Sequence, residues 1–194
     1  TLSGVKELSL FTFNGKVSSV SVEMGKAVLD GRNIPSTLDG ESVVDRAITV
    51  GGKNYNVTLV NVGNPHCVLF THEPPPTGAE LAAWGRALGH HPAFPGGINV
   101  EFAQPISPTG LAVTVWERGS GATLACGTGA CAVAAAAVLT GRCPRGAPIL
   151  VQLPGGTLEV CVQRDDTVLL TGDAAATFSG TVLIQPCKAP RGVV

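Results

Sequence analysis

The feature that most constrains the fold is a segment without a polar face, residues 127–140, which reads GTGACAVAAAAVLT. Its alanine-rich composition favours a helix, and Gly141 and Pro144 are typical residues to end one. A helix that is apolar all round must be covered on every side. The sequence therefore predicts an α+β fold, in which an antiparallel sheet or barrel is wrapped around a central buried helix.

Short strands are expected to supply that cover, because 25 glycines and 14 prolines indicate many tight turns. Asn14-Gly15 lies between two alternating stretches, residues 8–13 and 17–24, and predicts a hairpin. Gly51-Gly52 predicts a second one in the same way. The remaining predicted elements are a helix over 79–88 and strands over 47–50, 55–62, 66–70, 98–102, 111–116, 149–153, 157–163, 167–171 and 181–184.

Composition argues against several classes of protein. Charged residues make up 14% of the chain and the net charge is −1, so the basic surface of a nucleic-acid-binding protein is not expected. The longest apolar run, residues 130–139, is about half the length that crosses a membrane. No C-x-x-C pair occurs among the six cysteines, which disfavours a zinc or thioredoxin motif. We expect no metal, and reduced thiols in the cytoplasm.

Cys126 stands between a glycine-rich loop and the apolar segment, at or just before a helix N-terminus. Unpaired backbone N–H groups and the positive end of the helix dipole meet there, and both favour a thiolate. A buried structural thiol is the alternative, but the flanking loop favours a functional one. The other cysteines in or after the helix, Cys131, Cys143, Cys161 and Cys187, are expected to be packing or incidental residues.

Four local signals, of which this thiol and its loop are one, are expected to converge on one site, because each joins a turn or loop to a polar side chain. Such donors beside a thiolate suit removal of a proton next to a carboxylate. A phosphate loop is disfavoured, since Ala130-Cys131 follow Gly129 where that loop has lysine and serine or threonine. The four signals are Cys126 with Gly127, Thr128 and Gly129; Glu117 with Arg118; Asn64 with His66; and Asn99 after Gly97.

Three motifs in order give the chain a resemblance to a known family: VGNPHCV at 62–68, FPGGINVEF at 94–102 and WERGSGATLACGTGACA at 116–132. They closely resemble diaminopimelate epimerase, and the resemblance runs from about residue 20 to the last strands. It implies a cofactor-independent enzyme that converts LL-diaminopimelate to the meso isomer, for lysine and peptidoglycan precursors. Two thiols on opposite faces of the α-carbon act as acid and base, and the full-length form is implied to be a homodimer.

The resemblance also implies roles for individual residues. Cys126 matches one of the two acid/base thiols, Glu117 its carboxylate partner, and His66 the histidine that assists the other thiol. The positions that match substrate-binding residues are Asn64, Asn99, Glu117, Arg118, Gly127 and Thr128.

Two departures from the family pattern matter. The second catalytic cysteine of the family lies in a Cys-Gly-Asn-Gly context that is absent here, and Cys67 lacks the glycine loop needed to replace it. Ala122 stands where the family usually has glutamate. We therefore expect a C-terminal part with little activity alone. We expect three units in the chain. Residues 1–25 belong with an N-terminal lobe or crossover, and residues 26–175 form a C-terminal epimerase lobe. Residues 176–194 form a return strand and tail.

Two alternatives stay open. Proline racemase-like and phenazine-biosynthesis isomerase-like enzymes share the implied fold and would act on another substrate. A solitary lobe without catalysis, which binds a carboxylate or assembles with partners, is the second alternative.

Overall fold

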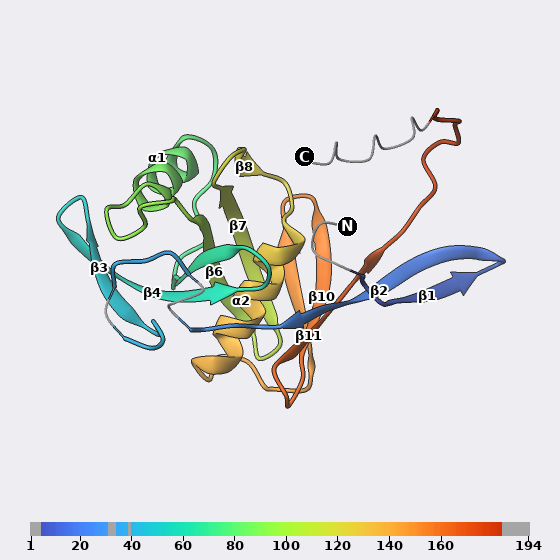
Figure 1. The fold of residues 1–194 in the computed structure, drawn as a ribbon, viewed down its shortest axis with the longest axis horizontal. Helices are drawn as coiled ribbons and strands as arrows, with labels where there is room; N and C mark the ends of the chain where they lie inside the picture. The colour runs from blue at the N-terminus through green and yellow to red at the C-terminus, as the bar shows by residue number, and fades with distance from the viewer. Residues whose placement is uncertain (1–4, 31–33, 39, 184–194) are drawn as a thin grey trace, which may run out of the picture.

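A computed structural model describes residues 5–30, 34–38 and 40–183, and it arranges eleven strands in one sheet (Figure 1). The strand order is β1-β2-β11-β10-β9-β7-β6-β5-β4-β3, with β8 paired to β7 off this path. The strands are β1 Leu8–Phe13, β2 Lys16–Lys26, β3 Arg46–Val50, β4 Lys53–Asn61, β5 Pro65–Phe70, β6 Asn99–Ser107, β7 Gly110–Glu117, β8 Gly121–Thr123, β9 Pro148–Leu153, β10 Gly156–Val162 and β11 Thr167–Asp173.

The sheet is mixed, which differs from the antiparallel sheet predicted from the sequence. Strand β5 pairs parallel with β6, and β7 pairs parallel with β9. Parallel neighbours need a long crossover between them, usually a helix. Helix α1 (Gly78–Gly89) supplies the crossover from β5 to β6, and α2 (Gly127–Leu139) lies in the connection from β7 to β9. Both helices were predicted, but their role in joining parallel strands was not.

Helix α2 is the buried apolar helix that the sequence predicts, with nine consecutive buried residues, 129–137. It contacts β4, β5 and β6 on one part of the sheet and β9, β10 and β11 on another. Cys126 is its N-cap, and the Sγ atom accepts a hydrogen bond from the Gly129 N–H. The helix ends in a Schellman motif, since Gly141 (φ 70°) and Arg142 donate back to the carbonyls of Val138 and Ala137.

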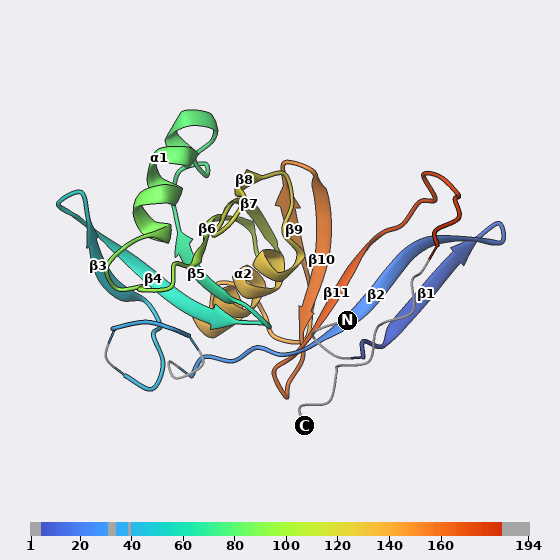
Figure 2. The same cartoon turned by 45° about the horizontal axis from the view of Figure 1, so that its top comes forward.

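The two helices define two hydrophobic clusters on opposite faces of the central strands. Successive side chains of β4 point to opposite faces of the sheet. Val57 and Leu59 belong to the cluster that contains Leu81 and Leu88 of α1. Val60 joins the cluster around α2 instead. Figure 2 shows α1 and α2 separated by the β5 and β6 strands. Polar residues on the α2 face of these strands are therefore directed toward the buried helix.

The predicted hairpins are confirmed. Asn14 (φ 50°) and Gly15 (φ 72°) form the two-residue turn between β1 and β2, and Gly51 and Gly52 form the turn between β3 and β4. The β1–β2 hairpin projects from the body at the right of Figure 1. Its apolar side chains are largely exposed, with 58% exposure at Leu10 and 71% at Phe13.

One predicted strand is wrong and one observed strand was missed. Residues 181–183 have no regular structure, whereas a strand was expected over 181–184, and residue 184 lies outside the described residues. The short strand β8 was not predicted, because three residues give too little alternation to recognise. In the described part of the chain, neither helix has the length and apolar character to cross a membrane.

Gly85 lets α1 pack directly on β7, and its replacement tests that contact. A Cβ atom at this position would lie 2.4 Å from Trp116 Cγ. We expect Gly85→Ala to lower the free energy of unfolding by about 1–3 kcal/mol through overpacking, less the roughly 0.5–1 kcal/mol that alanine gains inside a helix.

Denaturant unfolding measures this change. Gly119→Ala is the control, since a Cβ atom there would meet nothing within 4 Å. The control should change stability by no more than about 0.5 kcal/mol. Equal stability of the two variants would contradict the close packing of α1 on Trp116.

Candidate active site

The predicted site residues come together where three neighbouring strands meet the N-terminus of α2. Strands β5, β6 and β7 are adjacent in the sheet. His66 near the start of β5 is paired with Asn99 at the start of β6. Val100 is in turn paired with Trp116, the residue before Glu117 at the end of β7. These register positions bring the motifs at 62–68, 94–102 and 116–132 to one edge of the sheet.

Cys126 occupies a mostly enclosed position with 9% of its surface exposed. Its Sγ lies 3.3 Å from the Gly129 nitrogen, which donates to it, and 3.4 Å from Thr128 Oγ1. Burial raises the pKa of the thiol, the hydrogen bonds from Thr128 and Gly129 oppose that effect, and the negative charges of Glu101 and Glu117 raise the pKa further.

The resting form of Cys126 therefore differs from the thiolate that the helix N-terminus alone suggested. The hydrogen bond from the Gly129 N–H acts in the expected direction, but burial outweighs it. Near neutral pH the group is a thiol, which can donate a proton. Burial of this kind follows from packing between distant strands and α2, so the local sequence around residue 126 does not reveal it.

Glu117 is held beside this loop by β8. Its Oε1 accepts a hydrogen bond of 2.7 Å from the Thr123 hydroxyl. Glu117 and Gly121 are paired across β7 and β8, so the short strand folds back over the end of β7. Ala122, the position at which the resemblance led us to expect glutamate, is an exposed residue of β8 opposite Trp116.

His66 is completely buried and engages both of its ring nitrogens. Nδ1 lies 2.6 Å from Glu101 Oε1, and Nε2 lies 2.9 Å from Asn64 Oδ1. The first contact fixes the plane of the ring, and the second ties it to the turn before β5. The predicted pair of Asn64 and His66 is thus one hydrogen-bonded unit.

Glu101 is the polar residue that the sequence analysis missed. It is completely buried on β6, and its Oε2 has no hydrogen-bond partner among the described residues. A signal was available: in the run INVEF, a glutamate occupies the strand face opposite to Val100 and Phe102, inside an otherwise apolar strand. A buried carboxylate in such a place usually has a specific partner.

Asn99 and Arg118 are tied to the protein itself. The Asn99 amide donates to the Pro65 carbonyl at 3.0 Å and accepts from the Arg118 backbone N–H at 2.9 Å. The Arg118 guanidinium donates to the Gly96 carbonyl at 3.2 Å. Its aliphatic part packs on Gly97, where φ is 68° and a Cβ atom would be 3.1 Å from Arg118 Cδ. Asn99 therefore joins the β5, β6 and β7 segments at the site.

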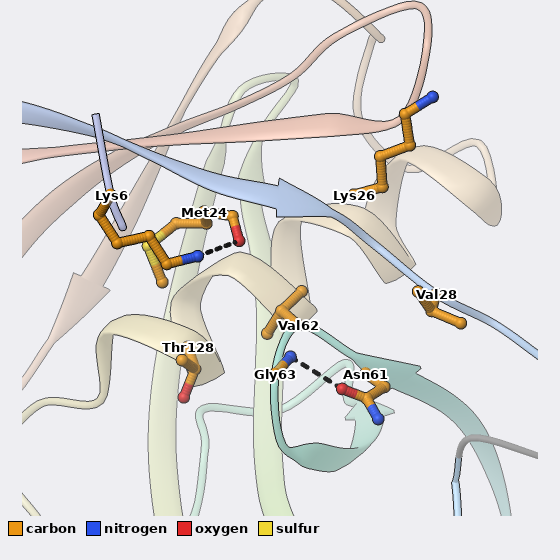
Figure 3. Close-up of a pocket in the computed structure, with 8 residues that line it drawn as sticks. All are labelled: Lys6, Met24, Lys26, Val28, Asn61, Val62, Gly63 and Thr128. Atoms are coloured by element: carbon orange, nitrogen blue, oxygen red, sulfur yellow. Dashed lines mark hydrogen bonds between the residues drawn. The ribbon is translucent and has the colours of Figure 1, made fainter. Parts of the chain in front are cut away.

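A pocket of about 540 Å³ borders this arrangement (Figure 3). Thr128 at the start of α2 lines it together with Gly63 from the turn before β5. Met24 and Lys26 of β2 line the opposite side, together with Lys6 from the segment before β1. Cys126 and His66 are not lining residues, so the pocket reaches the site through Thr128 and the turn.

The other described cysteines are placed less suitably for acid/base chemistry. Cys67 is completely buried, and burial followed by the charge of Glu101 raises its pKa well above the ordinary value. Cys131 lies inside α2, where burial raises its pKa to about 12. Cys143 and Cys161 also have raised pKa values, because both are partly desolvated. Cys187 lies outside the described residues. No cluster with metal-ligating character occurs in the described part of the chain.

Solved structures with the same fold are known. A probable proline racemase from Agrobacterium radiobacter K84 superposes with a TM-score of 0.68 at 18% identity, over 96% of this chain and 59% of the other. A hydroxyproline epimerase from Agrobacterium vitis gives 0.66 at 18% identity, over 88% of this chain and 54% of the other. The chain therefore shares its fold with these racemase and epimerase structures.

Sequence comparison identifies the family within this class. The diaminopimelate epimerase family matches residues 58–177. A diaminopimelate epimerase from Desulfitobacterium hafniense is 43% identical over 94% of this chain and 63% of its own length. One from Synechococcus elongatus is 46% identical over 84% of this chain and 58% of its own length. The chain belongs to the diaminopimelate epimerase family, and it spans about three fifths of the length of these relatives.

The geometry around Cys126 predicts how fast the thiol reacts at different pH values. The rate of alkylation by iodoacetamide should rise with pH. Because the pKa of Cys126 is raised, the midpoint of this pH profile should lie above the ordinary thiol pKa of about 8.5. Thr128→Ala should move the midpoint still higher, since it removes a hydrogen bond that favours the thiolate.

Peptide mass spectrometry after timed alkylation gives the midpoint for Cys126 separately from the other cysteines. Thr49→Ala, which removes an exposed hydroxyl on β3, is the control and should leave the midpoint unchanged. A midpoint below the ordinary thiol value would show that the helix N-terminus outweighs burial.

Proposed function

We propose that this chain forms part of a diaminopimelate epimerase, which inverts one α-carbon of LL-diaminopimelate to give the meso isomer without a cofactor. The observation that carries the proposal is the Cys126 thiol at the N-terminus of buried helix α2, beside the Glu117 carboxylate. Membership of the family supports the choice of substrate.

The N-terminus of α2 suits the α-carboxylate of an amino acid. Among the described residues, no partner is found for the N–H groups of Gly127 and Thr128, which are available to an anion. Removal of the α-proton pushes negative charge onto the carboxylate, and the same donors and the helix dipole stabilise that charge. Arg118, Asn64 and Asn99 form the remainder of the proposed substrate-binding set.

Proton transfer needs one group on each face of the α-carbon. A thiolate on one face takes the α-proton, and the Cys126 thiol gives its proton to the opposite face. The thiolate left at Cys126 accepts hydrogen bonds from Gly129 and Thr128. One proton is lost and one is gained, so the product differs from the substrate in configuration alone.

We propose that the second thiol comes from an N-terminal lobe that this chain does not contain. Two observations support this: the relatives are longer than the matched region, and Cys67 and Cys131 are completely buried. His66 is proposed to assist that second thiol. The chain alone would then have little or no epimerase activity.

The proposal also divides the chain into three units. Residues 1–25 carry the projecting hairpin, whose exposed apolar side chains have the character of a contact surface. Residues 26–175 form the proposed epimerase lobe, with the sheet wrapped around α2. Residues 176–194 are proposed as a tail, because the expected return strand is not formed over residues 181–183. A homodimer in the full-length form and a cytoplasmic location belong to the same proposal.

An epimerase or racemase with another amino-acid substrate is the second candidate. The fold neighbours include a hydroxyproline epimerase solved with trans-4-hydroxy-L-proline. At 18% identity this likeness concerns the fold alone, so substrate choice must be measured.

Exchange of the α-proton tests the proposal. The chain alone, and the chain joined to the N-terminal lobe of a relative, would be incubated in deuterated water with LL-diaminopimelate, proline or hydroxyproline under reducing conditions. We expect exchange of diaminopimelate by the longer form only. Cys126→Ala should reduce it by about 10²-fold or more, the usual contribution of acid–base catalysis.

Cys161→Ala, which removes a half-buried thiol from strand β10, is the matched control and should keep full exchange. Circular dichroism establishes that each form is folded. Exchange of proline or hydroxyproline in place of diaminopimelate would favour the second candidate. A folded longer form without exchange of any substrate would leave a binding module as the better description.

A further inference from the structure

Glu101 is a buried carboxylate that the mechanism above does not use. It lies on the face of β6 that is directed at α2 and is completely buried. Its Oε1 is 2.6 Å from His66 Nδ1, whereas Oε2 has no hydrogen-bond partner in the described part of the chain. An uncompensated buried carboxylate oxygen is costly, so its retention calls for a role.

The same carboxylate approaches the first turn of α2. A Cβ atom at Gly129 would lie 2.9 Å from Glu101 Oε1 and 3.3 Å from Cys126 Sγ. Gly129 has an ordinary backbone conformation, so its glycine is required by this close approach rather than by φ. One oxygen of Glu101 is thus placed next to both the His66 ring and the turn that holds the Cys126 thiol.

We propose that Glu101 is a positioning residue for the site: its carboxylate orients the His66 ring through Nδ1 and places a negative charge beneath the Cys126 thiol. The inference rests on the proposed function only where it concerns turnover. The arrangement around the thiol can be tested without any substrate.

The charge of Glu101 acts in a defined direction. The titratable groups that influence Cys126 are Glu101 on β6 and Glu117 on β7, and Cys131 in α2 is in turn influenced by Cys126. Both carboxylates disfavour the thiolate, and so keep the thiol protonated and able to donate. His66 Nδ1 lies 2.6 Å from the same Glu101 carboxylate.

The ring orientation follows from the same hydrogen bond. With Nδ1 held by Glu101, Nε2 is directed at Asn64 Oδ1, 2.9 Å away in the turn that borders the pocket. Without Glu101 the ring could turn about its χ angles, and the Asn64 amide would lose its partner. A displacement of about 1 Å in such a group can reduce a rate by about 10²-fold.

Three variants separate charge from position. Glu101→Gln keeps the length of the side chain and removes its charge. Glu101→Asp keeps the charge on a shorter side chain, which moves the carboxylate away from His66. Glu101→Ala removes both the charge and the contact with His66. Glu159→Gln removes an exposed carboxylate from β10 and is the matched control. Each is examined by pH-dependent alkylation of Cys126, resolved by peptide mass spectrometry, and by melting temperature.

We expect the alkylation midpoint of Cys126 to move to lower pH in Glu101→Gln and Glu101→Ala, and to stay near the wild-type value in Glu101→Asp and Glu159→Gln. In the longer, active form, kcat should fall by about 10-fold or more in Glu101→Asp and Glu101→Ala, with a smaller change in KM. The alanine variant leaves a cavity, so a lower melting temperature is expected for it.

An unchanged midpoint in Glu101→Gln would overturn the inference, as would an unchanged kcat in Glu101→Asp. A lower melting temperature without either change would make Glu101 an ordinary core residue. If the wild-type longer form shows no exchange, the proposed function fails, yet the midpoints still decide whether Glu101 acts on Cys126.

Discussion

Nine consecutive buried residues of α2 leave this helix no face for water, and the strands around it are arranged accordingly. Alanine side chains keep the helix narrow, so strands from two parts of the sheet reach it, β4 to β6 on one side of β7 and β9 to β11 on the other. The backbone groups at its ends need partners that the core does not offer. Cys126 satisfies one of them at the N-terminus, and the Schellman motif satisfies the Ala137 and Val138 carbonyls at the C-terminus.

The site is a consequence of this burial. The helix N-terminus lies where β5, β6 and β7 bring His66, Asn99 and Glu117 to one edge of the sheet. Asn99 joins the three segments through its amide, which explains why an asparagine begins β6. Burial also determines the chemistry, because it outweighs the helix N-terminus and leaves Cys126 as a thiol that can donate a proton.

Local patterns revealed much of this arrangement from the sequence. The apolar run predicted α2, Asn14-Gly15 predicted the first hairpin, and the three motifs identified the family. Contacts between distant residues were harder to foresee. The parallel pairs depend on how crossovers pack, the state of Cys126 depends on burial, and the partner of Glu101 lies on another strand. Which of the predicted residues contact a substrate stays a prediction.

The position of α2 in the chain has a consequence for how the protein folds. The helix follows β8, but β10 and β11, which help to cover it, are made later, and β4 and β5 are made much earlier. Contacts between residues so far apart in sequence carry a large loop-closure entropy and slow the search for the native state. Until residue 173 has been incorporated into the sheet, the alanine surface of the helix is open to other chains, and it is in this interval that aggregation competes with folding.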